Sequence, residues 1–99
     1  MIYEILAKGE QNATTGKVIC EKLDLSIREL QAGIRRERKA GRAICASTGN
    51  SGKAGYFIPA NQGEMRRYCN SLTHRAGEIF ATRKACLDLM DTLPAEAED

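Results

Sequence analysis

The chain has 99 residues, of which 42% are hydrophobic and 28% charged, and its formal net charge is +2. This length suits one domain with a modest core, plus at most one appended element. No apolar run approaches the ~18 residues of a membrane helix, and the first residues lack the basic and apolar regions of a signal peptide. We therefore expect a cytoplasmic protein with no membrane partner.

Charge is distributed unevenly along the chain. Residues 26–55 carry seven basic and two acidic side chains, a net charge of +5, whereas residues 88–99 carry five acidic and no basic ones. A basic middle is the usual footprint of a polyanionic partner such as nucleic acid. The alternative is an ordinary solvated charged face.

Two helical segments open the chain. Residues 2–6 predict a short helix with apolar residues on one side. A second helix is expected from a cap at Thr14 or Thr15 to about Leu23, with Ile19 among its inward residues.

A basic third helix follows after a very short connection. Ser26 and Glu29 have the spacing of a capping box, and Gly41 follows the helix where a left-handed residue is favoured. Leu30 and Ile34 mark its inner face. Two helices joined by about three residues, the second basic, predict a helix-turn-helix with a recognition helix over 26–40.

A β-hairpin is expected over residues 43–58. Its strands are predicted at 43–47 and 55–58, around a turn of small polar residues, and Pro59 ends the pairing because it has no amide hydrogen.

Residues 62–93 predict one long helix with an approximate heptad seam. Arg83 interrupts this seam, and Gly77 weakens the helix by about 1 kcal/mol relative to alanine. The segment is expected to protrude, to bend near Gly77 or to pair with another chain; we favour a homodimer. The acidic residues 94–99 are expected to fray. The predicted dimerisation residues are Met65, Cys69, Leu72, Ala76, Ile79, Cys86, Met90 and Leu93.

The order of elements and several residues together carry a family resemblance. These are the corner Leu23-x-Leu25-Ser26, the Leu30/Ile34 spacing, Gly41 after the predicted recognition helix, and the G-Y-x-I-P sequence that begins at Gly55. Residues 1–60 thereby resemble the N-terminal DNA-binding domain of biotin protein ligase repressors and related winged helix-turn-helix regulators. The chain is also similar to small winged-helix proteins of bacteriophages and mobile elements, which often append one long helix.

The resemblance implies a winged helix-turn-helix domain of three helices and a β-hairpin wing over 1–60. With the long C-terminal helix over 61–93 and the acidic, disordered tail over 94–99 that the sequence pattern predicts, the expected fold class is α+β. Two departures stand out. Glu37 lies where the family usually has a core leucine, and Gly33 is unusual in the middle of a recognition helix.

The resemblance also implies sequence-specific binding of double-stranded DNA by a small transcriptional regulator of phage or mobile-element origin. Arginine suits guanine, glutamine suits adenine, and small apolar side chains suit a thymine methyl group in the major groove. The residues expected at bases are Ile27, Arg28, Gln31, Ala32 and Arg35. The residues expected at the DNA backbone are Lys17, Arg36, Arg38, Lys39, Arg42, Asn50, Ser51 and Lys53.

Other classes are weighed against this one. An architectural or recombination-directionality protein, or a winged-helix protein-interaction module without DNA binding, would share the same pattern. Catalysis is not expected, and neither a cofactor nor a metal site is predicted, because the single histidine and the four cysteines show no ligand spacing. The cysteines are expected to be ordinary, mostly buried thiols in a reducing compartment.

Overall fold

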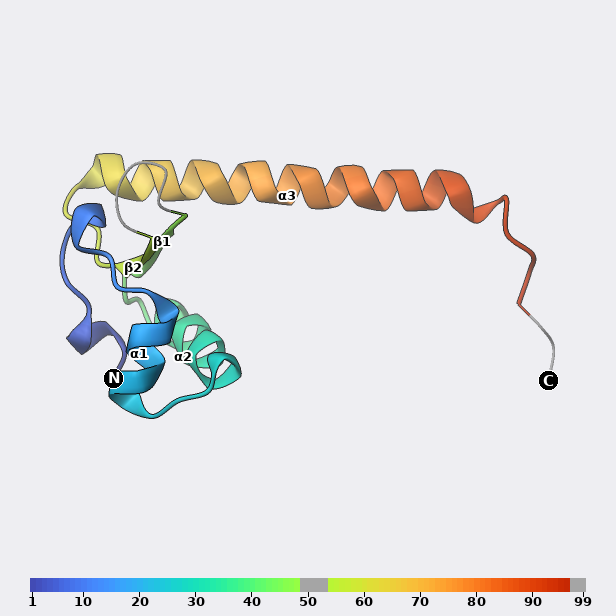
Figure 1. Cartoon of the computed structure of the whole chain (residues 1–99). Coiled ribbons are helices and arrows are strands. Elements are labelled where there is room, and N and C mark those ends of the chain that lie inside the picture. The colour runs from blue at the N-terminus through green and yellow to red at the C-terminus, as the bar shows by residue number, and fades with distance from the viewer. Residues whose placement is uncertain (49–53, 97–99) are drawn as a thin grey trace. The chain divides into compact units, whose positions relative to one another are not determined.

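The computed structural model describes residues 1–48 and 54–96 of the chain, which has an α+β fold (Figure 1). It divides into two compact units, residues 1–68 and residues 69 onward. The helices and strands, with two short 3₁₀ turns at Tyr3–Ile5 and Glu10–Asn12, are α1 (Gly16–Leu23), α2 (Ile27–Lys39), β1 (Cys45–Ser47), β2 (Gly55–Phe57) and α3 (Gln62–Met90).

The helix predicted over residues 2–6 is only the 3₁₀ turn Tyr3–Ile5. A segment this short gains too few hydrogen bonds to offset the cost of starting a helix. The predicted short helix is therefore present as a single 3₁₀ turn, and Ile2 and Leu6 are buried as their pattern indicated.

The corner between α1 and α2 has the predicted caps. The Thr15 hydroxyl accepts the amide of Val18, and Ser26 and Glu29 form a complete capping box at the start of α2. Asp24 ends α1 in the left-handed region at φ 54°, a conformation that aspartate tolerates better than most residues. Only three residues separate the two helices, so α2 begins at a fixed position beside α1.

The hairpin pairs β1 with β2 in antiparallel register, with Cys45 opposite Phe57 and Ser47 opposite Gly55. A third segment, absent from our predictions, pairs with the other edge of β2. Thr14 exchanges backbone hydrogen bonds of 2.9 and 2.8 Å with Tyr56, directly before the cap of α1. The return strand is thereby fixed to the start of the helical corner.

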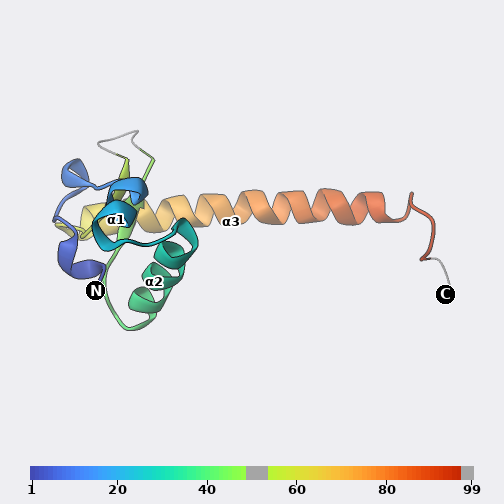
Figure 2. The ribbon, with the colours of Figure 1, turned by 60° about the horizontal axis from the view of Figure 1, so that its bottom comes forward.

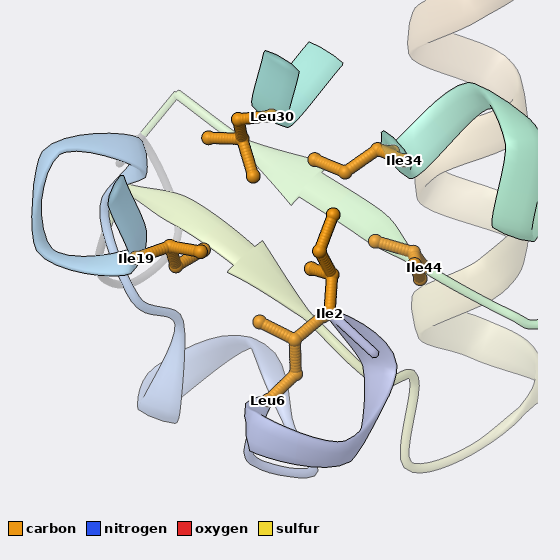
Figure 3. Close-up of a cluster of buried hydrophobic side chains, with 6 residues drawn as sticks. All are labelled: Ile2, Leu6, Ile19, Leu30, Ile34 and Ile44. Carbon is orange, nitrogen blue, oxygen red and sulfur yellow. The ribbon is translucent and has the colours of Figure 1, made fainter. Parts of the chain in front are cut away.

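A core of apolar side chains joins the N-terminal turn to the helices and the hairpin. Side chains from the first turn, from both helices and from the residue before β1 converge on one another (Figure 3). They are all at most 7% exposed, and burial of each such side chain contributes about 1.5–3 kcal/mol. The members are Ile2, Leu6, Ile19, Leu30, Ile34 and Ile44.

A second cluster draws the start of α3 into the same unit. Cys45 and Phe57 are buried with Ala13, and Met65 and Tyr68 of α3 pack against them. The first unit therefore ends at residue 68, inside α3, and not at residue 60 as predicted. Met65, predicted at a dimer seam, is used within its own unit.

After Tyr68, α3 runs as one continuous helix past Gly77 to Met90 (Figures 1 and 2). The bend considered near Gly77 is absent, and the helix ends three residues before the predicted Leu93. All side chains from 69 to 96 are exposed. Cys69 and Cys86 are thus exposed thiols, so only Cys45 and in part Cys20 meet the expectation of burial. Within the described residues, no helix is both long and apolar enough to cross a membrane.

Candidate nucleic-acid interface

The outer face of α2 gathers basic side chains in a line along the helix. Arg28, Ala32, Arg35 and Lys39 follow one another at intervals of three or four residues, which places them on one side of an α-helix. All are exposed, as is the neighbouring Gln31. The buried residues of α2 lie on the opposite side, so the core fixes which side chains face outward.

Gly33 explains how the inner face of α2 comes so close to the N-terminal segment. A Cβ atom at this position would lie 2.6 Å from Cδ1 of Ile2, which is itself 2% exposed. A glycine in the middle of a helix costs about 1 kcal/mol relative to alanine. Here the missing side chain makes room for Ile2, so the unusual Gly33 is a packing requirement of the buried face.

Glu37, the second departure from the family pattern, also has a structural role. Its two carboxylate oxygens accept the backbone amides of Ile2 and Tyr3, each at 2.9 Å. Burial raises the pKa of the Glu37 carboxyl, but these amide hydrogen bonds outweigh it and the pKa lies below its ordinary value. Glu37 therefore binds the first turn of the chain at the position where the family usually has a core leucine.

The two carboxylates of α2 are both directed to backbone amides. Glu29 accepts the amide of Ser26 at 2.8 Å, and this bond, with the Ser26 hydroxyl, lowers the pKa of Glu29. Among the described residues, no ion pair within 4.0 Å involves Arg28, Arg35 or Lys39. The outer face of α2 therefore presents positive charge without acidic partners.

A shallow depression of about 330 Å³ lies beside this face. It is lined by the second half of α2 and by Tyr56 of β2, the return strand of the hairpin. Polar and basic groups therefore line a concave surface between helix and hairpin. The lining residues are Gln31, Ile34, Arg35, Arg38, Lys39 and Tyr56.

All five residues predicted at base edges are exposed in α2. Ile27, in the first turn, is a large apolar residue with 54% exposure, although apolar neighbours are available in the core. Ile27 lies three residues before the buried Leu30, at the edge of the inner face, whereas the other four share the outer face. All five predicted side chains are accessible. They are Ile27, Arg28, Gln31, Ala32 and Arg35.

Two of the arginines predicted at phosphates are engaged within the protein. Arg38 is half-buried: its Nε donates to the Ile44 carbonyl at 2.9 Å, and its guanidinium lies 5.2 Å from the centre of the Tyr68 ring. Arg42 pairs with Glu4 at 3.0 Å and stacks on Tyr3. Arg38 therefore joins α2 to the hairpin and to α3, and is poorly placed for a phosphate.

Of the other residues predicted at the DNA backbone, three are exposed and three lie outside the described residues. Lys17, Arg36 and Lys39 are exposed. Asn50, Ser51 and Lys53, predicted at the hairpin tip, lie outside the described residues.

Sequence reasoning missed the buried Glu10. Its carboxylate accepts the Ser47 hydroxyl at 2.9 Å and pairs with Arg67 of α3 at 3.1 Å. The group thereby joins β1 to the first turns of α3. No local pattern marks such a residue, because its partners lie 37 and 57 positions away.

Comparison with known proteins gives no further information about this surface, so its interpretation depends on its geometry. No family model, curated protein or solved structure matches the chain.

Proposed function

We propose that the chain is a winged-helix DNA-binding protein, with α2 as the recognition helix in the major groove and the hairpin as a wing on the neighbouring backbone. The observation that carries this proposal is the outer face of α2, where Arg28, Gln31 and Arg35 are exposed together. An α-helix fits the major groove, and arginine and glutamine pair with guanine and adenine edges there.

The surroundings of this face support the same function. The segment 26–55 carries a net charge of +5, and the carboxylates of Glu29 and Glu37 are held by backbone amides. Arg36 and Lys39 flank the proposed base contacts and suit phosphates, which position a protein on DNA without selecting a sequence. A small transcriptional regulator is the role that these features fit best.

The proposal is tested by a triple variant, Arg28→Ala/Gln31→Ala/Arg35→Ala. Bound duplexes are first selected from a random pool with the natural protein, and affinities are then measured by fluorescence anisotropy. We expect a loss of about 100-fold or more on the selected site, because each good base contact contributes about 1–3 kcal/mol. The variant should also lose its preference over unrelated duplexes.

The matched control is Lys8→Ala/Lys84→Ala, which removes the same amount of positive charge from other exposed positions. This control should lose much less affinity and keep its sequence preference. Unchanged affinity in the triple variant, or no DNA binding by the natural protein even at low salt, would overturn the proposal.

A further inference from the structure

The second unit has an apolar face that residues 1–48 and 54–96 leave uncovered. The large apolar side chains of α3 beyond Tyr68 are 40–68% exposed, and most of them share one side of the helix at heptad spacing. Helices in proteins gain most of their stability from packing such a face. The residues on this face are Leu72, Ile79, Phe80, Leu87 and Met90.

We propose that this face packs against α3 of a second copy running in the opposite direction, around a two-fold axis near Ala81. In that register the heptad seam, formed by residues 72, 76, 79, 83, 86 and 90, is self-complementary. Leu72 lies level with the partner's Met90, Ala76 with the partner's Cys86, and Ile79 with the partner's Arg83. All layers of the seam between residues 72 and 90 are matched in this way.

Arg83 disfavours a parallel pair of α3 helices. It lies in the middle of the apolar seam, and a parallel pair would place the two Arg83 side chains directly opposite each other. Two like charges in an apolar layer repel one another and lose solvation. In the antiparallel pair each Arg83 lies beside an isoleucine and can extend its charged end past it to solvent.

The flanks of the seam favour the same direction. One flank carries Thr73, Phe80 and Leu87, whereas the other carries Arg75, Thr82 and Leu89. Parallel coiled coils bring opposite flanks together, which would set Phe80 against Arg75 and Leu87 against Thr82. Antiparallel pairs bring like flanks together, so Phe80 would lie beside the partner's Phe80 near the two-fold axis.

Charge is also complementary between the two ends. Residues 69–76 carry one basic and no acidic side chain, and residues 86–93, which are level with them in this register, carry two acidic and no basic ones. An antiparallel pair aligns these opposite charges and also the opposite ends of the helix dipoles. The second copy is therefore the occupant that this face fits.

The chain's own exposed cysteines provide the test. Cys69 and Cys86 both lie on the seam, and a parallel pair would bring each one beside its twin. In the antiparallel pair the two Cys86 residues are offset by about 15 Å and the two Cys69 residues by about 36 Å. A disulfide needs Cα atoms within about 7 Å, so the natural protein should not crosslink.

The decisive variant is Ala76→Cys, because residue 76 lies level with the partner's Cys86. The dimer is treated with diamide, which takes two electrons and two protons from each pair of thiols, then blocked with N-ethylmaleimide and run on a non-reducing denaturing gel. We expect most of the Ala76→Cys protein to run as a covalent dimer. The control Ala76→Cys/Cys86→Ser should stay monomeric on the gel, because the two introduced thiols are offset by about 15 Å.

Sedimentation equilibrium of the natural protein accompanies the gel and should give a dimer. Crosslinking of the natural protein through Cys69 or Cys86, or of the control variant, would overturn the antiparallel assignment in favour of a parallel one. A monomer in sedimentation would overturn the pairing altogether. The inference does not rest on the proposed function: neither readout involves DNA, so failure here and failure of DNA binding are distinguished.

Discussion

At the scale of single residues, Gly33 shows how a core contact can decide the composition of a helix. Alanine would improve the helix propensity of α2 by about 1 kcal/mol. Its Cβ would nevertheless lie 2.6 Å from Cδ1 of the buried Ile2, and overpacking of a core typically costs about 1–3 kcal/mol.

We therefore expect Gly33→Ala to lower the free energy of unfolding in urea titrations. The variant Ile2→Val removes the Cδ1 atom that meets the new methyl group, so the double variant Ile2→Val/Gly33→Ala should recover part of the loss. A double-mutant cycle measures this coupling. Gly77→Ala in α3, where an added Cβ meets no atom within 4 Å, is the matched control and should raise stability.

The structural roles of residues were predictable where their partners lie in the same helix. They were not predictable where the partners lie on distant segments of the chain. The capping box of Ser26 and Glu29 and the buried Leu30 and Ile34 follow from spacing within a single helix. The partners of Gly33, Glu37 and Arg38 are on other segments, up to 35 positions away. Gly33 and Glu37 therefore stood out as departures from the family pattern, and Arg38 was predicted at a phosphate.

At the scale of elements, hydrogen bonds to Glu37 connect α2 to the first turn of the chain. The amides of Ile2 and Tyr3 belong to the start of the 3₁₀ turn Tyr3–Ile5 and have no carbonyl partner within that turn. A carboxylate from α2 replaces that partner. Hydrogen bonds to charged groups contribute about 1.5–3 kcal/mol, so this one side chain is a large part of what holds the two segments together.

Glu37→Gln should therefore destabilise the protein by about 2 kcal/mol at pH 7, since glutamine brings one acceptor oxygen and no charge. Because folding lowers the pKa of Glu37, its contribution is fully present above the unfolded value of 4.5 and is lost as pH falls through the folded pKa. The difference between natural protein and variant should thus shrink below pH 4.5 in urea titrations. The exposed Glu21→Gln is the control, and an equal loss there would contradict this role.

Elements were predicted well where their signals lie inside the chain segment itself. The bounds of α1 and α2 and the strands of the hairpin follow from caps, glycines and β-branched or aromatic residues. The pairing of Thr14 with Tyr56 was missed because a single pair of backbone hydrogen bonds leaves no sequence pattern. The predicted first helix over residues 2–6 is longer than the observed 3₁₀ turn. Its apolar pattern reflects burial against α2 and does not determine how many residues are helical.

At the scale of the whole molecule, charge should govern affinity for DNA. Each neutralised phosphate lowers the slope of log affinity against log salt by about 0.9. Lys39→Ala should weaken binding to all duplexes about equally and reduce the magnitude of this slope by about one for each bound copy. Anisotropy titrations between low and physiological salt measure both effects.

The neighbouring Arg38→Ala is the control for this experiment. Its guanidinium is engaged with Ile44 and Tyr68, so the variant should lose stability and leave the salt slope unchanged. A slope that changes with Arg38 and not with Lys39 would contradict the assignment of phosphate contacts. Sequence alone could not separate these two adjacent cations, because their difference lies in what the fold places around them.

The first unit ends at Tyr68, inside α3, and this position determines where the chain can be joined to another helix in a chimera. A chimera joined at the loop before α3 would discard Met65 and Tyr68, leaving the cluster of Cys45 and Phe57 uncovered. A junction after residue 68 keeps those contacts and exchanges only the exposed turns that follow. The point at which the first unit can be joined to a different helix therefore lies about two turns inside α3 and not at the loop before it.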